Sequence, residues 1–123
     1  MEIIGIGIDL ADIDRVEAVL EKYPRFAQRC FTPHEQEYAF RFAKPGRRLA
    51  ARFGGKEAVM KSLGRGFRQI MWQDIEITGG GAPRVNLSGT AAARAAELGV
   101  DKVLVTITHT DSSALVMAMA VRS

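Results

Sequence analysis

Three short clusters in this sequence carry residue types that could do chemistry. Asp9 follows a glycine-rich apolar run in "GIGIDL", and His109 stands in the alternating run "TITHT". Glu57 and Lys61 lie four residues apart in "KEAVMK", so on a helix they share one face. Two carboxylates can hold a hard cation, while an ammonium and an imidazole can bind phosphate groups. One functional interpretation is therefore a hard cation held beside groups that bind phosphate.

Each cluster also has a purely structural interpretation. An aspartate at the end of a strand is commonly a turn or capping residue. Glu57 and Lys61 could form an exposed pair worth only a few tenths of a kcal/mol. His109 could be a turn residue with no ligand. Taken one at a time, the clusters do not distinguish chemistry from structure.

Several common site motifs are absent from the sequence. It contains no "GxxxxGK[ST]", no G-x-S-x-G and no Cys/His metal spacing, and "GIGIDL" lacks the third glycine of G-x-G-x-x-G. A P-loop NTPase, a serine hydrolase and a zinc enzyme are therefore unsupported. Cys30, the single cysteine, is predicted to be a buried thiol, which fits a reducing cytoplasm.

Positive charge is concentrated in one stretch of the chain. Residues 15–68 hold thirteen of the 17 basic residues and five of the 14 acidic ones, a net charge of +8, while the remainder carries −5. A localised field of this kind indicates an anionic partner, which could be a nucleic acid, a phosphorylated small molecule or an acidic protein.

The pattern of the first half predicts one strand followed by helices. The strand covers 2–8 and ends at Asp9, and Asp12 caps the helix that follows. After a short helical turn at 25–31, Thr32 and Glu35 have the spacing of a capping box that opens a third helix. A longer helix over 47–63 ends at Gly64.

The second half changes to the alternation of strands. Residues 73–78 and 84–88 predict a hairpin around the turn 79–83, and Ser88 is predicted to cap a helix over 90–98. Two more strands, 102–110 and 113–121, complete the chain. We therefore expect a single α+β domain over 1–123, with a mainly antiparallel sheet packed against helices. No apolar run could span a membrane and no signal peptide is evident, so we expect a cytoplasmic protein with no membrane partner.

Several segments in this order resemble one family. They are "GIGIDLADIDR" at 5–15, "FTPHEQEY" at 31–38, "ARFGGKEAVMKSLG" at 51–64, "WQDIEI" at 72–77, "GAPRVNLSG" at 81–89 and "VTITHTDSSALVMA" at 105–118. The combination resembles holo-acyl-carrier-protein synthase, the small bacterial 4′-phosphopantetheinyl transferase, over nearly the whole chain. The resemblance implies transfer of the phosphopantetheine arm of coenzyme A to a serine of apo acyl carrier protein, releasing adenosine 3′,5′-bisphosphate, in support of fatty acid biosynthesis.

The resemblance also implies roles for individual residues. Asp9 and Glu57 would be the Mg²⁺ ligands and, with Lys61 near the pyrophosphate, the catalytic residues. The residues that would bind coenzyme A are Arg52, Lys61, Pro83 and His109. The group that deprotonates the carrier serine is not identified, and our hypothesis is a metal-bound water relayed through Glu57 or Asp9.

The family docks acidic carrier proteins with arginines, and Arg15, Arg25 and Arg29 match those positions inside the basic stretch. The family is typically a homotrimer with active sites shared between subunits. We expect a homotrimer here, and the sequence leaves open whether one site draws on one subunit or on two. The sequence departs from the common pattern at Gly54 and Gly55, where relatives usually have alanines, and at Thr106, where many have serine. We expect the two glycines to let the helix pack closely against the first strand near Asp9.

Two alternative functions remain at this stage. The same transfer could serve carrier domains of polyketide or multifunctional synthases. A non-catalytic, basic nucleic-acid-binding module would explain the charge, but it would not explain Asp9 and Glu57 within their motifs. It would also lack the exposed aromatic residues that such modules interleave with basic ones. We therefore expect no nucleic-acid partner.

Overall fold

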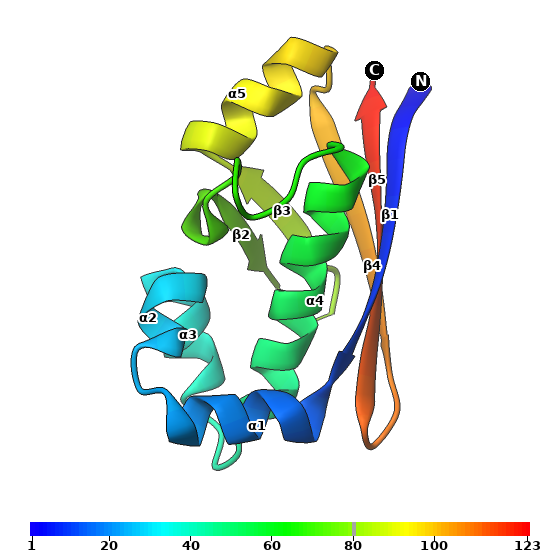
Figure 1. The fold of residues 1–123 in the computed structure, drawn as a ribbon. Helices are drawn as coiled ribbons and strands as arrows, with labels where there is room; N and C mark the ends of the chain where they lie inside the picture. Colours follow the sequence, from blue (N-terminus) through cyan, green and yellow to red (C-terminus); the bar gives the residue numbers. More distant parts are fainter. Residues whose placement is uncertain (80) are drawn as a thin grey trace.

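The computed structural model describes residues 1–79 and 81–123, and Gly80, in the predicted 79–83 turn, lies outside the described residues (Figure 1). The elements follow one another as β1 (Glu2–Asp12), α1 (Ile13–Lys22), α2 (Phe26–Cys30), α3 (Pro33–Ala39), α4 (Gly46–Ser62), the 3-10 turn η1 (Trp72–Asp74), β2 (Ile75–Thr78), β3 (Arg84–Leu87), α5 (Gly89–Leu98), β4 (Lys102–His109) and β5 (Ser113–Arg122). Among the described residues, no helix is both long and apolar enough to cross a membrane.

The strands form two antiparallel sheets. One has three strands in the order β1-β5-β4, and the other is the β2–β3 hairpin. Helix α4 runs along one face of the larger sheet, and the hairpin, α2 and α3 lie on the other side of α4 (Figure 1). The sequence prediction is confirmed for the α+β architecture, for the β2–β3 and β4–β5 hairpins and for the long helix α4. The single predicted sheet is instead two sheets.

Strand β1 is longer than the sequence predicted. It pairs with β5 from Glu2, opposite Arg122, as far as Asp12, opposite Ser113. The prediction that the strand ends at Asp9 was wrong, because Leu10 and Ala11 continue the ladder with β5. Asp9 therefore projects from within a paired strand, whose backbone hydrogen bonds hold it in place.

Two glycines of β1 bring α4 close to the sheet. A Cβ on Gly5 would lie 1.9 Å from the carbonyl oxygen of Ser62, and one on Gly7 would lie 1.9 Å from that of Ala58. Both positions must be glycine, because a helix backbone cannot yield as a flexible side chain can. Asp9, two residues after Gly7, consequently faces the same helix.

The pair Gly54 and Gly55 behaves only partly as expected. A Cβ on Gly54 would lie 3.3 Å from the Cβ of Ala11 and 3.4 Å from Oδ2 of Asp9, so this residue does pack against β1. Gly55 instead faces β2, where an added Cβ would lie 2.2 Å from Cδ1 of Ile77. Close packing against the first strand is thus a property of Gly54 alone.

Helix caps were predicted with mixed success. Asp12 accepts a hydrogen bond from the backbone N–H of Arg15 at 3.0 Å, and the capping box of Thr32 and Glu35 is complete. Ser88 occupies the N-cap of α5 but makes no side-chain capping bond. The carboxylate of Asp74 accepts from the N–H of Thr90 at 2.8 Å in its place, a contact made across 16 residues that a local pattern does not reveal.

Candidate active site

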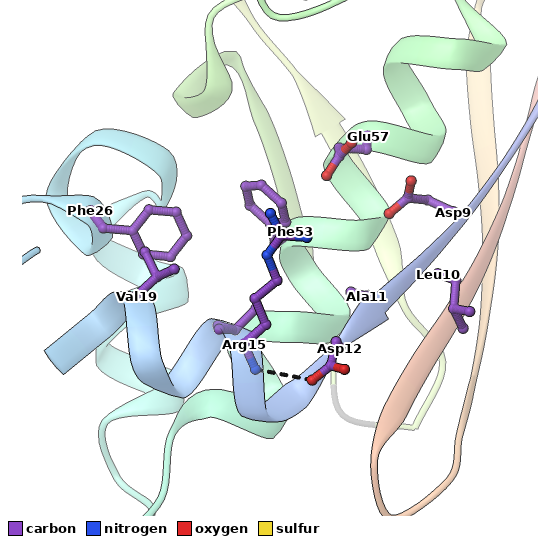
Figure 2. A pocket seen from close by; sticks show the side chains of 10 residues that line it. Asp9, Leu10, Ala11, Asp12, Arg15, Val19, Phe26, Phe53 and Glu57 are labelled. Atoms are coloured by element: carbon purple, nitrogen blue, oxygen red, sulfur yellow. Dashed lines mark hydrogen bonds between the residues drawn. The ribbon is translucent and has the colours of Figure 1, made fainter. Parts of the chain in front are cut away.

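Asp9 and Glu57 face the same cavity from two elements (Figure 2). Asp9 comes from β1 and Glu57 from α4, and the glycine contacts described above hold these two elements together. The cavity has a volume of about 440 Å³, and its other walls include Arg15 and Phe53. The structure thus brings together two carboxylates that are 48 positions apart in the sequence.

Lys61 joins this pair through Asp9. Its ammonium donates to the carbonyl oxygen of Ile8 at 2.9 Å and to Oδ1 of Asp9 at 3.3 Å. The sequence offered an ion pair between Lys61 and Glu57, one helical turn away, but in the structure Lys61 pairs with Asp9. Lys61 remains 56 % exposed, whereas the Asp9 side chain is only 13 % exposed. Lys61 lines a second cavity of about 310 Å³ together with Glu57, so it adjoins both carboxylates.

Burial disturbs the ionisation of both carboxyls, and repulsion from Asp9 adds to the effect at Glu57. Burial raises the pKa of Asp9, an effect that the hydrogen bond and charge of Lys61 oppose. Burial also raises the pKa of Glu57, with a further increase from the negative charge of Asp9. Buried carboxylates whose charged forms are disfavoured gain from a cation bound beside them, and oxygen donors of this kind suit Mg²⁺.

The donor set at this cavity is small. Within residues 1–79 and 81–123, no group of three or more His, Cys, Asp or Glu side chains gathers that could enclose a metal. Asp9 and Glu57 alone match the way in which Mg²⁺ is usually held, by one or two carboxylates with substrate phosphates and water completing its shell. The residues present therefore fit this ion.

Arg52 and His109 meet in a different cavity. It has a volume of about 480 Å³, and its walls also include Tyr38, Arg47 and Arg48. The guanidinium of Arg52 lies 4.5 Å from the centre of the Tyr38 ring. Burial lowers the pKa of His109, as do the positive charges of Arg47 and Arg48. This cavity is strongly basic, and it shares no lining residue with the Asp9–Glu57 cavity.

Arg52 has unused hydrogen-bonding capacity. It is 5 % exposed, and its Nη2 donates to the carbonyl oxygen of Gly79 at 3.4 Å. Its Nε is buried and has no partner among the described residues. Pro83 lies two residues beyond Gly81, which lines the same cavity. The sequence missed Arg47 and Arg48 here, although Arg48 and Arg52 are four apart and therefore share a helix face.

The three predicted docking arginines lie on one side of the molecule. Arg15 lines the Asp9–Glu57 cavity, and the exposed Arg25 and Arg29 line a neighbouring apolar cavity of about 780 Å³. Val19 and Phe26 belong to both cavities, so the arginines adjoin the carboxylates. The sequence did not identify these apolar walls, because Phe26 and Phe53 are indistinguishable from ordinary core residues in a helical pattern.

Comparison with known proteins decides the family. Residues 5–119 match the model of the 4′-phosphopantetheinyl transferase superfamily. The holo-[acyl-carrier-protein] synthase of Moorella thermoacetica is 46 % identical over 115 residues, which is 92 % of this chain and 90 % of the relative. This chain belongs to the holo-acyl-carrier-protein synthase family. Membership selects the transferase over the nucleic-acid-binding alternative.

Solved structures of holo-acyl-carrier-protein synthases have the same fold. The Plasmodium yoelii protein superposes with a TM-score of 0.87 at 33 % identity, covering 98 % of this chain and 96 % of that one. A Bacillus anthracis holo-acyl-carrier-protein synthase, solved in complex with CoA (3′,5′-ADP), superposes with a TM-score of 0.81 at 26 % identity, and the match covers 100 % of both chains. The α+β fold expected from the resemblance is therefore confirmed.

Proposed function

We propose that this protein transfers the 4′-phosphopantetheine group of coenzyme A to a serine of apo acyl carrier protein. The products are holo acyl carrier protein and adenosine 3′,5′-bisphosphate. The observation that carries the proposal is that Asp9 and Glu57 line one cavity, with Lys61 paired to Asp9, in a chain of the holo-acyl-carrier-protein synthase family. Coenzyme A is also the ligand of a solved relative.

Asp9 and Glu57 are the residues that would hold Mg²⁺. When bound, the ion would polarise the pyrophosphate and offset the charge that develops on the leaving bisphosphate. Lys61 would supply a further positive charge beside the carboxylates, where its exposed ammonium contacts Asp9. Glu57 or Asp9 would also accept the proton of the carrier serine, because a serine hydroxyl is a weak nucleophile until its proton is removed.

The basic cavity of Arg52 and His109 suits the nucleotide end of coenzyme A. The partnerless Nε of Arg52, together with Arg47 and Arg48, offers donors to the 3′-phosphate. A neutral His109, favoured by its lowered pKa, can still donate one hydrogen bond to a phosphate oxygen. Pro83, two residues after the cavity-lining Gly81, would contribute to the wall that contacts the adenine of coenzyme A.

These two cavities are complementary if neighbouring subunits share a site, as in a homotrimer. The outer face of the β1-β5-β4 sheet, opposite α4, exposes apolar side chains that one chain leaves uncovered: Ile6, Ile8, Leu10, Leu104, Leu115 and Met117. Such a continuous apolar face is typical of a surface that another subunit covers. The Arg52 cavity of one subunit would then complete the Asp9–Glu57 cavity of the next.

A mixing experiment tests the shared site. Glu57→Gln and His109→Ala variants, each with little activity alone, are unfolded together, refolded as a mixture and assayed. If sites are shared, mixed trimers contain one site with both residues intact, so activity returns. If each site lies within one subunit, the mixture stays as inactive as its components. Sedimentation of the unmodified protein gives the subunit number independently.

The transfer itself is tested by its small product. The protein is incubated with coenzyme A, Mg²⁺ and apo acyl carrier protein, and adenosine 3′,5′-bisphosphate is measured by chromatography. We expect its release to require the carrier and to stop when the acceptor serine is replaced by alanine. Release that is independent of the carrier would indicate hydrolysis of coenzyme A and contradict the proposal. Carrier domains of polyketide or multifunctional synthases, assayed in parallel, identify the preferred acceptor.

A further inference from the structure

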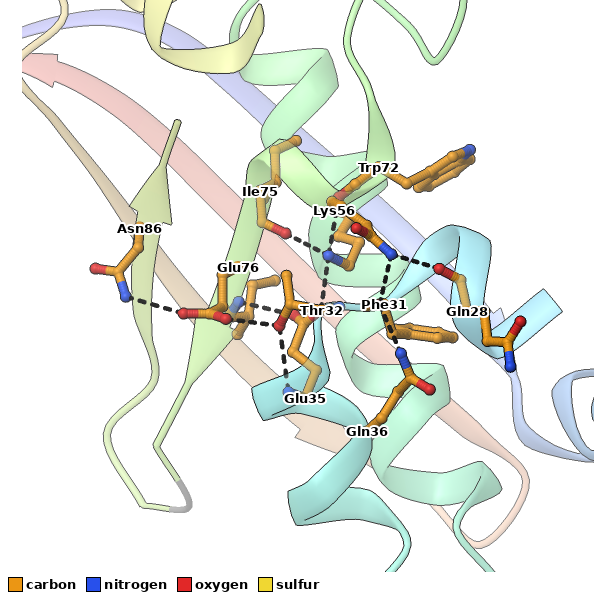
Figure 3. A network of polar contacts seen from close by, with 12 residues as sticks. Gln28, Phe31, Thr32, Glu35, Gln36, Lys56, Trp72, Ile75, Glu76 and Asn86 are labelled. Atoms are coloured by element: carbon orange, nitrogen blue, oxygen red, sulfur yellow. Dashed lines mark hydrogen bonds and ion pairs between the residues drawn. The ribbon is translucent and has the colours of Figure 1, made fainter. Parts of the chain in front are cut away.

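A buried ion pair joins α3 to α4 behind the Asp9–Glu57 cavity (Figure 3). Nζ of Lys56 lies 2.8 Å from Oε1 of Glu35, and both side chains are 0 % exposed. Removing two charges from water is costly, and apolar side chains often stabilise a fold as well as such a pair does. Stability alone is therefore a weak explanation for this pair, and the transfer chemistry proposed above does not use it.

Lys56 uses all three of its N–H donors. Besides Glu35, its ammonium donates to the carbonyl oxygen of Trp72 at 2.9 Å and to that of Ile75. Trp72 begins the η1 turn, and Ile75 is the residue directly after it. Lys56 consequently ties both ends of this short turn to α4 (Figure 3).

Both carboxylate oxygens of Glu35 also accept backbone hydrogen bonds. Its Oε1 also accepts from the backbone N–H of Thr32 at 2.9 Å, and its Oε2 accepts from the N–H of Ile77 at 2.9 Å. One carboxylate thus connects the start of α3, strand β2 and the ammonium on α4. A network in which every member has its partners admits one arrangement of these elements rather than several.

The tethered turn carries a wall of the candidate active site. The Trp72 ring stacks on Phe53, with ring centres 4.8 Å apart, and on Phe67 at 6.1 Å. Trp72 and Phe67 line a cavity of about 310 Å³ together with Glu57 and Lys61. Lys56 also directly precedes Glu57, so anchoring its side chain fixes the helical turn that presents this carboxylate.

We propose that the Glu35–Lys56 pair is a positioning unit for phosphopantetheine transfer, holding the Trp72 wall and the Glu57 carboxylate in their working arrangement. The inference rests on the proposed function of the Asp9–Glu57 site. Neither Glu35 nor Lys56 reaches substrate in this account. Both act through the groups that they hold.

The test replaces both charges together, because removing one would leave the other buried and unpaired. In Glu35→Gln/Lys56→Met, the side chains keep similar volumes but the tethers to Trp72 and Ile75 are lost. Trp72 is the single tryptophan, so its fluorescence reports on the turn without any ligand. At a temperature well below that of unfolding, we expect the emission of Trp72 to shift to the red and to be quenched more easily by acrylamide. We also expect kcat to fall by about tenfold or more. The Mg²⁺ concentration for half-maximal rate should rise by about tenfold.

The matched control is Glu37→Gln/Arg41→Met, which removes an exposed pair beginning in the same helix α3. Its fluorescence, kcat and Mg²⁺ dependence should equal those of the unmodified protein. A folded Glu35→Gln/Lys56→Met variant with unchanged fluorescence or unchanged kcat would overturn the proposal. Failure of the unmodified protein to transfer phosphopantetheine would refute the proposed function instead, and the fluorescence would still test the tether.

A second variant keeps the test decisive if the double variant does not fold. Gln73 is exposed and holds the same turn from the side of α2, donating to the carbonyl oxygens of Gln28 and Phe31. Gln73→Ala should fold and should show the same fluorescence change and a smaller decrease in kcat. A normal kcat in Gln73→Ala despite a displaced Trp72 would mean that the position of this turn does not affect turnover.

Discussion

At the scale of residues, the candidate site depends on two carboxylates that the fold holds at a cost. Burial and the negative charge of Asp9 raise the pKa of Glu57, and burial raises that of Asp9. Lys61 relieves part of this cost at Asp9 through a contact of 3.3 Å. Strain of this electrostatic kind is expected where a protein prepares a site for a cation.

Removing one charge should therefore separate stability from activity. A carboxyl whose folded pKa is raised destabilises the fold once it ionises, so stability is lost as pH rises through that pKa. Glu57→Gln should raise the free energy of unfolding at pH 8 in a chelator, by less than about 1 kcal/mol because the group is only partly buried and solvent screens it. The same variant should lose about a hundredfold or more in kcat/KM. Urea unfolding and steady-state assays measure both, with Glu37→Gln as control. A less stable Glu57→Gln protein, or one with normal activity, would contradict the assignment.

The pH dependence of transfer should also reflect the raised pKa values of Asp9 and Glu57. Protons compete with Mg²⁺ for Asp9 and Glu57, whose pKa values are raised, so kcat/KM should fall on the acid side at a pH above the value of about 4 at which ordinary carboxyls titrate. Raising the Mg²⁺ concentration should move this acid limb to lower pH, because the cation displaces protons. Profiles of kcat/KM against pH at several Mg²⁺ concentrations check this. An acid limb that ignores Mg²⁺ would mean that the titrating groups are not the metal ligands.

At the scale of elements, features that depend on residues close in sequence were predicted well, and features that depend on distant residues were not. The capping box at Thr32 and Glu35 depends on residues three apart, and it was read correctly from the sequence. The extension of β1 to Asp12 depends on pairing with β5, a partner about one hundred residues later, and it was missed. Asp9, Glu57 and Lys61 were named from motifs and resemblance, but the Lys61–Asp9 contact and the cavity that Asp9 shares with Glu57 required the structure.

The buried pair of Glu35 and Lys56 shows the same limit. The sequence identified Glu35 as a capping residue and gave Lys56 no role of its own. A lysine between Gly55 and the apolar run "AVM" is a weak signal of burial, but nothing in the chain points to a carboxylate 21 residues earlier. Burial of two charged residues is settled by packing between helices, which one-dimensional periodicity does not encode.

The contact between α4 and β1 supports a prediction about glycines. Gly7→Ala places a Cβ against the backbone of Ala58 and should destabilise the protein by about 3 kcal/mol or more. Gly54→Ala meets side chains at 3.3 Å and beyond and gains helix propensity of about 1 kcal/mol, so its stability should change little or rise. Gly66→Ala, in open space, is the control. Chemical denaturation measures all three. If Gly54→Ala proved as damaging as Gly7→Ala, the two glycines would have the same packing role.

At the scale of the whole molecule, charge and exposed apolar surface are segregated. The exposed Arg25 and Arg29 flank an apolar cavity beside the carboxylates, with Arg15 inside the adjoining one. The outer face of the larger sheet is apolar instead. One surface thus suits an acidic partner approaching Asp9 and Glu57, and the other suits a second copy of the chain.

The docking surface should make carrier recognition sensitive to salt. Each of Arg15→Gln, Arg25→Gln and Arg29→Gln should raise the KM for acyl carrier protein by about threefold, while the KM for coenzyme A stays within error. The effect should shrink as ionic strength increases, because exposed charges are screened. Lys102→Gln, an exposed charge on β4, is the control. A KM for the carrier that is flat across salt concentrations would argue against electrostatic docking.

The most direct test of the central claim is the intact mass of the carrier protein itself. Apo acyl carrier protein is incubated with coenzyme A, Mg²⁺ and either the unmodified protein or its Asp9→Asn variant, and the carrier is then weighed by mass spectrometry. The account predicts that the unmodified protein adds one phosphopantetheine group to each carrier, at the serine, and that Asp9→Asn leaves the carrier in its apo form. A carrier whose mass does not change with the unmodified, folded protein would contradict the account.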